Sequence, residues 1–198
     1  MPNRGVHPLM IPASHYTQVL ISSCDEIGNW AGNPEPVELD IETKYSGAAS
    51  VKQDVPDTYP TFHCRSMQWT QSLDARSWSY LNFRHRCTQP ASTLMQSRAY
   101  IVDAASRYYG WEYLYDADTW QLVSLDMQHP HYVSDPPPDL GSIAFISIEH
   151  TPGDAPPFTA WVDELSAMVE APGLAQQMML VMVLVMGVTL AMSMMEEV

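Results

Sequence analysis

Positive charge is scarce in this sequence of 198 residues. Nine Lys and Arg residues stand against 23 Asp and Glu, only Lys44 and Lys52 are lysines, and no Lys or Arg follows Arg107. A protein that binds nucleic acid needs a basic stripe to neutralise phosphates, so we exclude a nucleic-acid partner. A strongly acidic surface instead keeps a protein soluble by self-repulsion.

Several motifs that carry chemistry are also missing. The chain has no P-loop, no GxGxxG and no GxSxG sequence, so we predict that it is not an enzyme and has no catalytic residues. Its three cysteines, Cys24, Cys64 and Cys87, form no CxxC pair, which argues against a zinc site. Cys64 and Cys87 could form a disulfide if their strands are neighbours; the alternative is free, buried thiols.

The N-terminus lacks the apolar run of a secretory signal. Residues 1–16 read MPNRGVHPLMIPASHY, and Pro2, Pro8 and Pro12 discourage regular structure. We therefore expect an N-terminal arm over residues 1–18 and no cleaved signal peptide.

Short runs rich in Val, Ile and aromatic residues alternate with turn-rich stretches over residues 19–170. Such spacing is typical of an all-β fold, and we predict one jelly-roll β-sandwich domain there. The clearest half-buried strand is 37–43, in which Val37, Leu39 and Ile41 should face inward, followed by a turn at Ser46-Gly47. The other expected strands are 19–21, 62–69, 78–87, 97–103, 111–115, 121–127, 143–149 and 158–165.

The C-terminal segment differs in kind from the rest. Residues 178–195 contain no charge, and the apolar stretch extends back to Leu174, behind the Pro172-Gly173 break. A helix over 174–195 would be about 33 Å long, enough to cross a bilayer core of about 30 Å. We predict a hydrophobic helix that anchors the protein in a membrane, or alternatively in a helical bundle. Its anchoring side chains would be Met178, Leu180, Leu184, Val188 and Met192.

Aromatic residues cluster at 108–115, and this run is the best candidate for a binding site. In a strand, Trp111, Tyr113 and Tyr115 share one face, while Glu112 and Leu114 point to the other. Three alternatives stay open for the shared face: it fills the sandwich core, forms a protein interface, or stacks on sugar rings.

The beginning of the expected sandwich resembles a known family. Residues 19–32, VLISSCDEIGNWAG, and 37–55, VELDIETKYSGAASVKQDV, resemble the first strands of carbohydrate-binding-module-type jelly rolls, also called galactose-binding-like domains. There a strand with an acidic pair leads to a Trp, here Asp25, Glu26 and Trp30, and a Gly-x-x-Ser stretch, here 47–50, opens the next strand.

The middle and the end of the domain carry the rest of the resemblance. Residues 72–87, SLDARSWSYLNFRHRC, resemble the family's Asp-Leu-Ser step before an aromatic strand, although the order here is Ser72-Leu73-Asp74. Residues 141–169 resemble its last two strands, with Asp163-Glu164 as the acidic pair of the final strand. The resemblance covers about three quarters of the chain and is a pattern of strands.

The resemblance implies that the first and last strands are adjacent. Asp25, Glu26, Asp163 and Glu164 would then meet, and grouped carboxylates suit a structural Ca²⁺. The alternative is that these are solvated carboxylates at strand edges. We expect no other cofactor.

Domains of this type occur in secreted glycan-binding proteins and in structural proteins of viruses. Because no signal peptide is evident, we expect a structural, non-enzymatic component of a virus particle or similar surface assembly, located at a virion or membrane surface. Its partners would be copies of itself, other structural proteins and a lipid bilayer. The alternative is a carbohydrate-binding module, displayed on a membrane by the C-terminal helix, with a glycan as partner.

Overall fold

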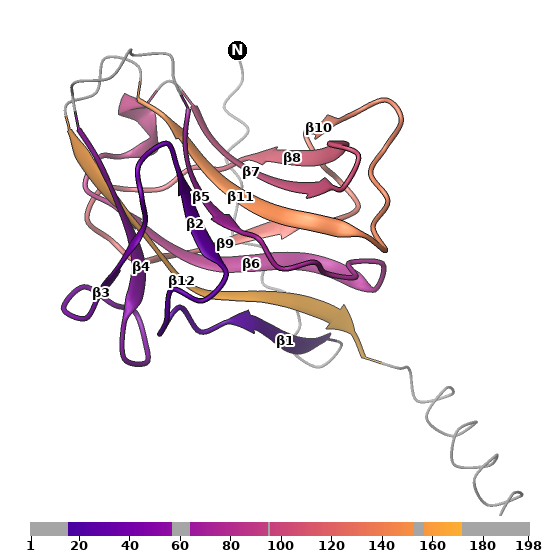
Figure 1. The fold of residues 1–198 in the computed structure, drawn as a ribbon, viewed down its shortest axis with the longest axis horizontal. Helices are drawn as coiled ribbons and strands as arrows, with labels where there is room; N and C mark the ends of the chain where they lie inside the picture. The colour runs from indigo at the N-terminus through magenta and orange to yellow at the C-terminus, as the bar shows by residue number, and fades with distance from the viewer. Residues whose placement is uncertain (1–15, 57–63, 95, 153–156, 172–198) are drawn as a thin grey trace, which may run out of the picture.

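The protein is a sandwich of two antiparallel β-sheets, which a computed structural model describes over residues 16–56, 64–94, 96–152 and 157–171 (Figure 1). In these residues the one helical element is a short 3₁₀ helix, η1 (Ala91–Thr93). The predicted all-β sandwich is thus confirmed. No helix in the described residues is long and apolar enough to cross a membrane, and the segment 174–195 lies outside them.

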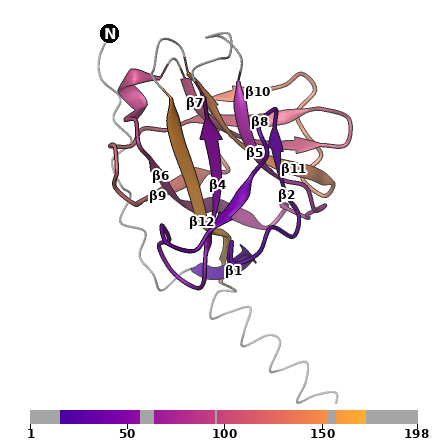
Figure 2. The same cartoon turned by 60° about the vertical axis from the view of Figure 1, so that its left-hand side comes forward.

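The first sheet, sheet A, is built around the long strand β12. Its order is β3-β4-β12-β6-β9, and β1 pairs with β12 beside this path. The first half of β12 pairs with β4 and its second half with β1, while β6 follows its other edge (Figures 1 and 2). The bounds in sheet A are β1 (Tyr16–Ser22), β3 (Glu38–Asp40), β4 (Ser50–Val55), β6 (Trp78–Cys87), β9 (Gln121–Asp126) and β12 (Phe158–Glu170).

The second sheet, sheet B, lies across the core from sheet A. Its order is β10-β8-β7-β11-β5-β2, with every neighbouring pair antiparallel. The bounds in sheet B are β2 (Trp30–Asn33), β5 (Arg65–Trp69), β7 (Gln96–Asp103), β8 (Tyr108–Glu112), β10 (Tyr132–Val133) and β11 (Ile143–Thr151).

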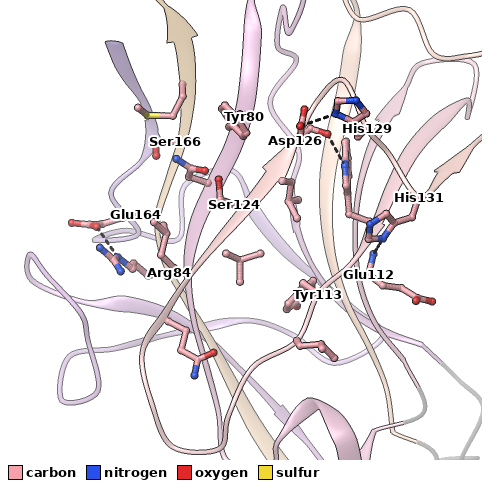
Figure 3. Close-up of a pocket in the computed structure, with 18 of the residues that line it drawn as sticks. Tyr80, Arg84, Glu112, Tyr113, Ser124, Asp126, His129, His131, Glu164 and Ser166 are labelled. Atoms are coloured by element: carbon pink, nitrogen blue, oxygen red, sulfur yellow. Dashed lines mark hydrogen bonds and ion pairs between the residues drawn. The ribbon is translucent and has the colours of Figure 1, made fainter. Parts of the chain in front are cut away.

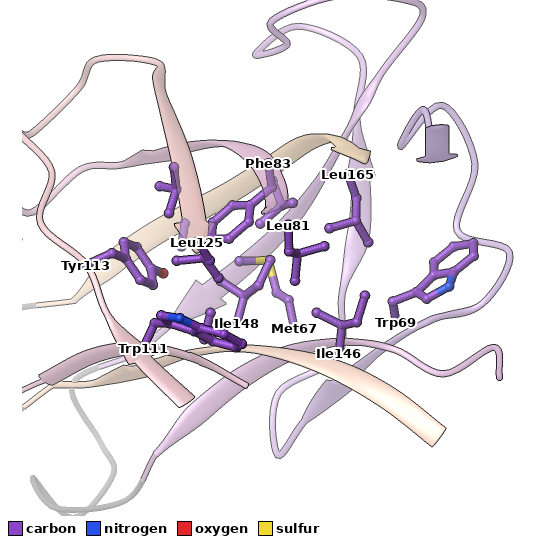
Figure 4. Packing of buried hydrophobic residues seen from close by; sticks show 14 of the residues in the cluster. Met67, Trp69, Leu81, Phe83, Trp111, Tyr113, Leu125, Ile146, Ile148 and Leu165 are labelled. Carbon is purple, nitrogen blue, oxygen red and sulfur yellow. The ribbon is translucent and has the colours of Figure 1, made fainter. Parts of the chain in front are cut away.

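The core forms where the inward faces of the two sheets meet. Leu81 and Phe83 of β6 pack toward Ile146 and Ile148 of β11, with Leu165 of β12 beside them (Figure 4). Each of these side chains is fully buried, and burial of one such side chain contributes about 1.5–3 kcal/mol. The alternation of β6 therefore directs Tyr80, Asn82 and Arg84 to the opposite, outer face of sheet A.

Two buried polar pairs lie inside the domain, and the first of them joins the two sheets. His85 of β6 and His150 of β11 are fully buried, and their Nε2 atoms lie 3.0 Å apart, so one ring donates a hydrogen bond to the other. The guanidinium of Arg65 forms an ion pair with Glu35 at 2.9 Å, and both side chains are buried. Buried polar groups of this kind need their partners, because an unpaired charge in the interior is costly.

Some details of the predicted strands are wrong. The segment 37–43 contributes only β3, at the edge of sheet A, and Ile41 is 70% exposed instead of facing the core. Strands β2 and β10 were not predicted, and β4 was expected only from the family resemblance, in which the stretch 47–50 opens a strand. The possible disulfide is also excluded, since Cys64 precedes a strand of sheet B and Cys87 ends a strand of sheet A; all three cysteines are free, and Cys64 is exposed.

Candidate functional site

A cleft of about 830 Å³ crosses the outer face of sheet A and reaches around its edge strand β9 (Figure 3). Strands β1, β12, β6 and β9 supply its floor, and residues 112–114 with the 129–131 loop supply the far wall. The polar lining residues are Gln18, Tyr80, Asn82, Arg84, Glu112, Gln121, Ser124, Asp126, His129, His131, Glu164 and Ser166.

The middle of the cleft floor is a row of small polar side chains. Strand register places Asn82 between Ser166 of β12 and Ser124 of β9. Gln18 of β1 donates a hydrogen bond to Ser166 Oγ at 3.1 Å. Asn82, Ser124 and Ser166 all line the cleft. A floor with amide and hydroxyl groups is suited to a polar ligand.

One end of the cleft combines a cation with apolar surface. The Nε atom of Arg84 lies 3.6 Å from Glu164 Oε2, and its guanidinium stacks 4.1 Å above the ring of Tyr45. Trp120 also packs against Tyr45, with ring centroids 6.3 Å apart and the rings at a steep angle. Tyr45 is 44% exposed, and Leu122, paired with Arg84 across the strands, is 53% exposed. This end of the cleft therefore presents apolar surface beside the guanidinium of Arg84, which is paired with Glu164.

The far wall is a network of hydrogen-bonded side chains. His129 Nδ1 lies 2.8 Å from Asp126 Oδ2, and His131 Nδ1 accepts a hydrogen bond from the backbone N–H of Glu112 at 2.9 Å. The Glu112 carboxylate is held by Arg98 at 3.1 Å and by the Tyr132 hydroxyl. These contacts, the Tyr132 hydrogen bond foremost, lower the pKa of Glu112 and keep it ionised.

The predicted aromatic site residues lie in the core. Trp111, Tyr113 and Tyr115 share one face as expected, but they are only 2%, 4% and 5% exposed. The outer face carries Glu112 and Leu114, which line the cleft, while Trp111 and Tyr113 border it from the interior side. Of the three alternatives that the sequence left open, the structure thus places these rings in the sandwich core, and they offer no open face for stacking on sugars.

Three of the four candidate calcium ligands bind different groups of the protein. Asp163 Oδ2 accepts the backbone N–H groups of Tyr45 and Ser46 at 2.8 and 3.1 Å. Asp25 Oδ1 likewise accepts those of Ala48 and Ala49, and these hydrogen bonds lower the pKa of Asp25.

The other two candidates have separate surroundings. Glu164 accepts the hydroxyl of Ser46 at 2.8 Å and pairs with Arg84, while Glu26 is exposed. The described residues contain no group of three or more potential ligands. A calcium ion at these residues stays a prediction from sequence alone.

The residues of the cleft floor were missed by sequence reasoning. Tyr80, Asn82 and Arg84 alternate with Leu81 and Phe83, so the polar face of β6 was visible in the sequence. Nothing in the sequence showed that this face is hollowed and flanked by Ser124 and Ser166, because that depends on strand order and register.

Comparison with known proteins identifies the fold. No protein-family model matches the chain, and no curated protein matches it. Among solved structures, a family 30 carbohydrate-binding module gives a TM-score of 0.57 at 14% identity, covering 78% of this chain and 99% of that one. The family 11 module of the Clostridium thermocellum cellulase Lic26A-Cel5E gives 0.55 at 12% identity, covering 78% and 95%.

A second structure of a Clostridium thermocellum family 11 module, in complex with a β-1,3-1,4-mixed-linked tetrasaccharide, gives a TM-score of 0.54 at 13% identity, with 78% of this chain and 96% of that one covered. At these identities the likeness concerns the fold alone, and it confirms a β-sandwich like that of carbohydrate-binding modules. None of these three is described as a virus protein, so the expected place in a virus particle gains no support from them.

Proposed function

We propose that this domain is a glycan-binding module and that the cleft across sheet A is its binding site. The observation that carries the proposal is the row of polar groups that lines the cleft floor: the Ser166 hydroxyl, the Asn82 amide and the Ser124 hydroxyl. Sugar hydroxyls can both donate hydrogen bonds to groups of these kinds and accept them. The likeness to carbohydrate-binding modules in fold supports the same assignment.

The surroundings of these groups suit a sugar chain. A sugar ring presents hydroxyls around its edge and C–H groups on its faces, so its site needs both polar and apolar contacts. The cleft offers Asn82, Ser124 and Ser166 in its middle, with Tyr80 at one end and Leu122 at the other. We assign binding and not hydrolysis, because the carboxylates of Glu112, Asp126 and Glu164 are each engaged by protein partners.

Display on a surface is the second part of the proposal and rests on sequence alone. Residues 174–195 would anchor the module at a membrane or virion surface. No observation on the described residues favours the purely structural role in a virus particle over glycan binding, so we retain the anchored module as the proposed function.

The test is calorimetric titration of the full chain with soluble neutral polysaccharides: β-1,3-1,4-glucan, galactomannan and β-1,4-galactan. All samples contain a detergent without a sugar head group, because the apolar segment is expected to need one. At least one polymer should bind, and Asn82→Ala should weaken that binding by about tenfold, the size of one or two hydrogen bonds.

The matched control for this variant is Asn29→Ala. Asn29 is exposed, hydrogen-bonds to Gln71 and is not among the cleft residues, so its removal should leave the affinity unchanged. Melting curves of both variants check that the fold is intact. If no polymer binds, or if Asn82→Ala binds as tightly as the wild type, the proposed function is wrong.

A further inference from the structure

The charges that line the cleft are unbalanced. The lining residues include three carboxylates, Glu112, Asp126 and Glu164, and a single guanidinium, that of Arg84. These four charged side chains, three negative and one positive, give the cleft lining a net charge of −2, within a chain whose net charge is −14. A binding site with this sign repels anionic ligands and raises no barrier against neutral ones.

Arg84, the cation that lines the cleft, already contacts a carboxylate and an aromatic ring. Arg84 lies between Glu164, at 3.6 Å, and the ring of Tyr45, at 4.1 Å from the guanidinium carbon. Glu164 is itself fixed by the hydroxyl of Ser46 at 2.8 Å, in the segment that Asp163 holds through backbone N–H groups. A carboxylate or sulfate on a glycan would have to compete with Glu164 for Arg84, and the charge of Asp126 opposes its entry.

We propose that the cleft selects neutral over anionic glycans, and that Glu164 is the specificity-determining residue because it occupies Arg84. This inference rests on the proposed function, since it concerns the ligand class of the same cleft. The role of Glu164 is to withhold a cation from the ligand, so its removal should broaden what the cleft accepts.

The experiment compares one polymer in two charge states. The neutral polysaccharide that binds best in the panel above is oxidised at C6, so that part of its hexoses become uronates on an unchanged backbone. Wild-type chain is titrated with both forms near pH 7.5 and at about 0.02 M salt. The neutral form should bind at least about tenfold more tightly, and the difference should shrink at about 0.5 M salt, where charges are screened.

Two variants separate a released cation from a general change of charge. Glu164→Gln removes one negative charge and frees Arg84, and its amide oxygen still accepts the Ser46 hydroxyl. It should bind the oxidised polymer about fivefold more tightly than the wild type does, as one partly exposed ion pair allows. Asp126→Asn removes one charge from the same cleft without freeing a cation, so its gain should be smaller than twofold. Melting curves confirm that both variants are folded.

Each outcome decides a separate point. If no neutral polymer binds, the proposed function fails. If a neutral polymer binds but its oxidised form binds the wild type equally well, the function stands and the selectivity is overturned. If Glu164→Gln gains no affinity for the oxidised form, or Asp126→Asn gains as much, the specific role of Glu164 is overturned. If the wild type rejects the oxidised polymer only because that polymer fits the cleft poorly, Glu164→Gln should not improve its binding. That result would count against the proposal.

Discussion

Mild acid should destabilise this domain through the histidine pair in its core. His85 and His150 are fully buried and hydrogen-bonded to each other through Nε2, and the Tyr113 hydroxyl lies 3.4 Å from His150 Nε2. Burial lowers the pKa of His150 to about 3. Burial, and then the neighbouring His150, also lower the pKa of His85 far below its ordinary value. Both rings are therefore neutral in the folded protein.

The sign and size of the effect follow from linkage. An unfolded histidine has a pKa of about 6.5, so below that pH the unfolded chain binds protons that the folded protein does not. The stabilisation is complete above about pH 6.5 and is lost as the pH falls, by about 1.4 kcal/mol per pH unit for each histidine. At about pH 5 the loss is about 2 kcal/mol per histidine and about 4 kcal/mol for the pair, a large share of a stability of about 5–15 kcal/mol.

Other titrating groups change the free energy of unfolding over a different pH range or in the opposite direction. Hydrogen bonds and ion pairs lower the pKa values of Asp74, Asp103 and Glu112, so their stabilisation is lost only as the pH falls below the unfolded values of about 4. Burial raises the pKa of Asp163, which therefore opposes the histidine effect in part. The pH interval from about 6.5 to 5 thus reports mainly on the histidines.

The assay is urea unfolding followed by tryptophan fluorescence at several pH values between about 7.5 and 5. The wild type should lose about 4 kcal/mol of unfolding free energy over this range, while a His85→Leu/His150→Leu double variant should lose less than about 1 kcal/mol. His129→Gln, at an exposed histidine, is the control and should behave like the wild type. Equal losses in the wild type and the double variant would refute the reasoning.

Three further predictions concern other parts of the chain. Glu35→Ala removes the carboxylate that pairs with the buried guanidinium of Arg65 and should cost about 1.5–3 kcal/mol in urea unfolding, whereas a loss below about 1 kcal/mol would contradict a stabilising ion pair there. Because Asp25 and Asp163 bind backbone N–H groups, a chelator should leave the melting temperature unchanged, and a clear drop would instead establish the structural calcium ion. The full chain should float with liposomes while a chain ending at Glu170 should not; flotation of both, or of neither, would contradict the anchor expected at 174–195.

The strands that were predicted share a composition that local reasoning can see. β6, β7, β9, β11 and β12 alternate apolar and polar residues or carry runs of Val, Ile and aromatic residues, and one face of each is buried in the core. Strands β2 and β4 read WAGN and SVKQDV, with little apolar content, so composition did not predict them and only the family resemblance implied β4. They exist because β5 and β12 offer partners for their backbone hydrogen bonds, which is a tertiary cause.

Alternation also shows that a strand has two faces without showing which face is covered. The segment 37–43 alternates regularly, yet only three of its residues pair, at the edge of sheet A, and Ile41 is left in solvent. In the segment 111–115, the prediction of which side chains share a face was correct. The aromatic face lies in the core, and the face with Glu112 and Leu114 lines the wall of the cleft. The sequence alone therefore left several roles open for the aromatic face, and the packing of the two sheets places that face in the core.

The acidic pair Asp163-Glu164 shows why a motif and its local geometry can differ. In a regular strand, consecutive side chains point to opposite faces, but here β12 is irregular: its register with β6 shifts between Asp163 and Ser166, and Glu164 has a φ of +50°. At this irregularity β12 also changes partner from β4 to β1. Asp163 is thereby buried under the loop that contains Tyr45, while Glu164 reaches Arg84 in the cleft. Two adjacent carboxylates that suggest one cation site are thus better explained as two groups with separate tasks, one holding a loop and the other occupying the cation of the cleft.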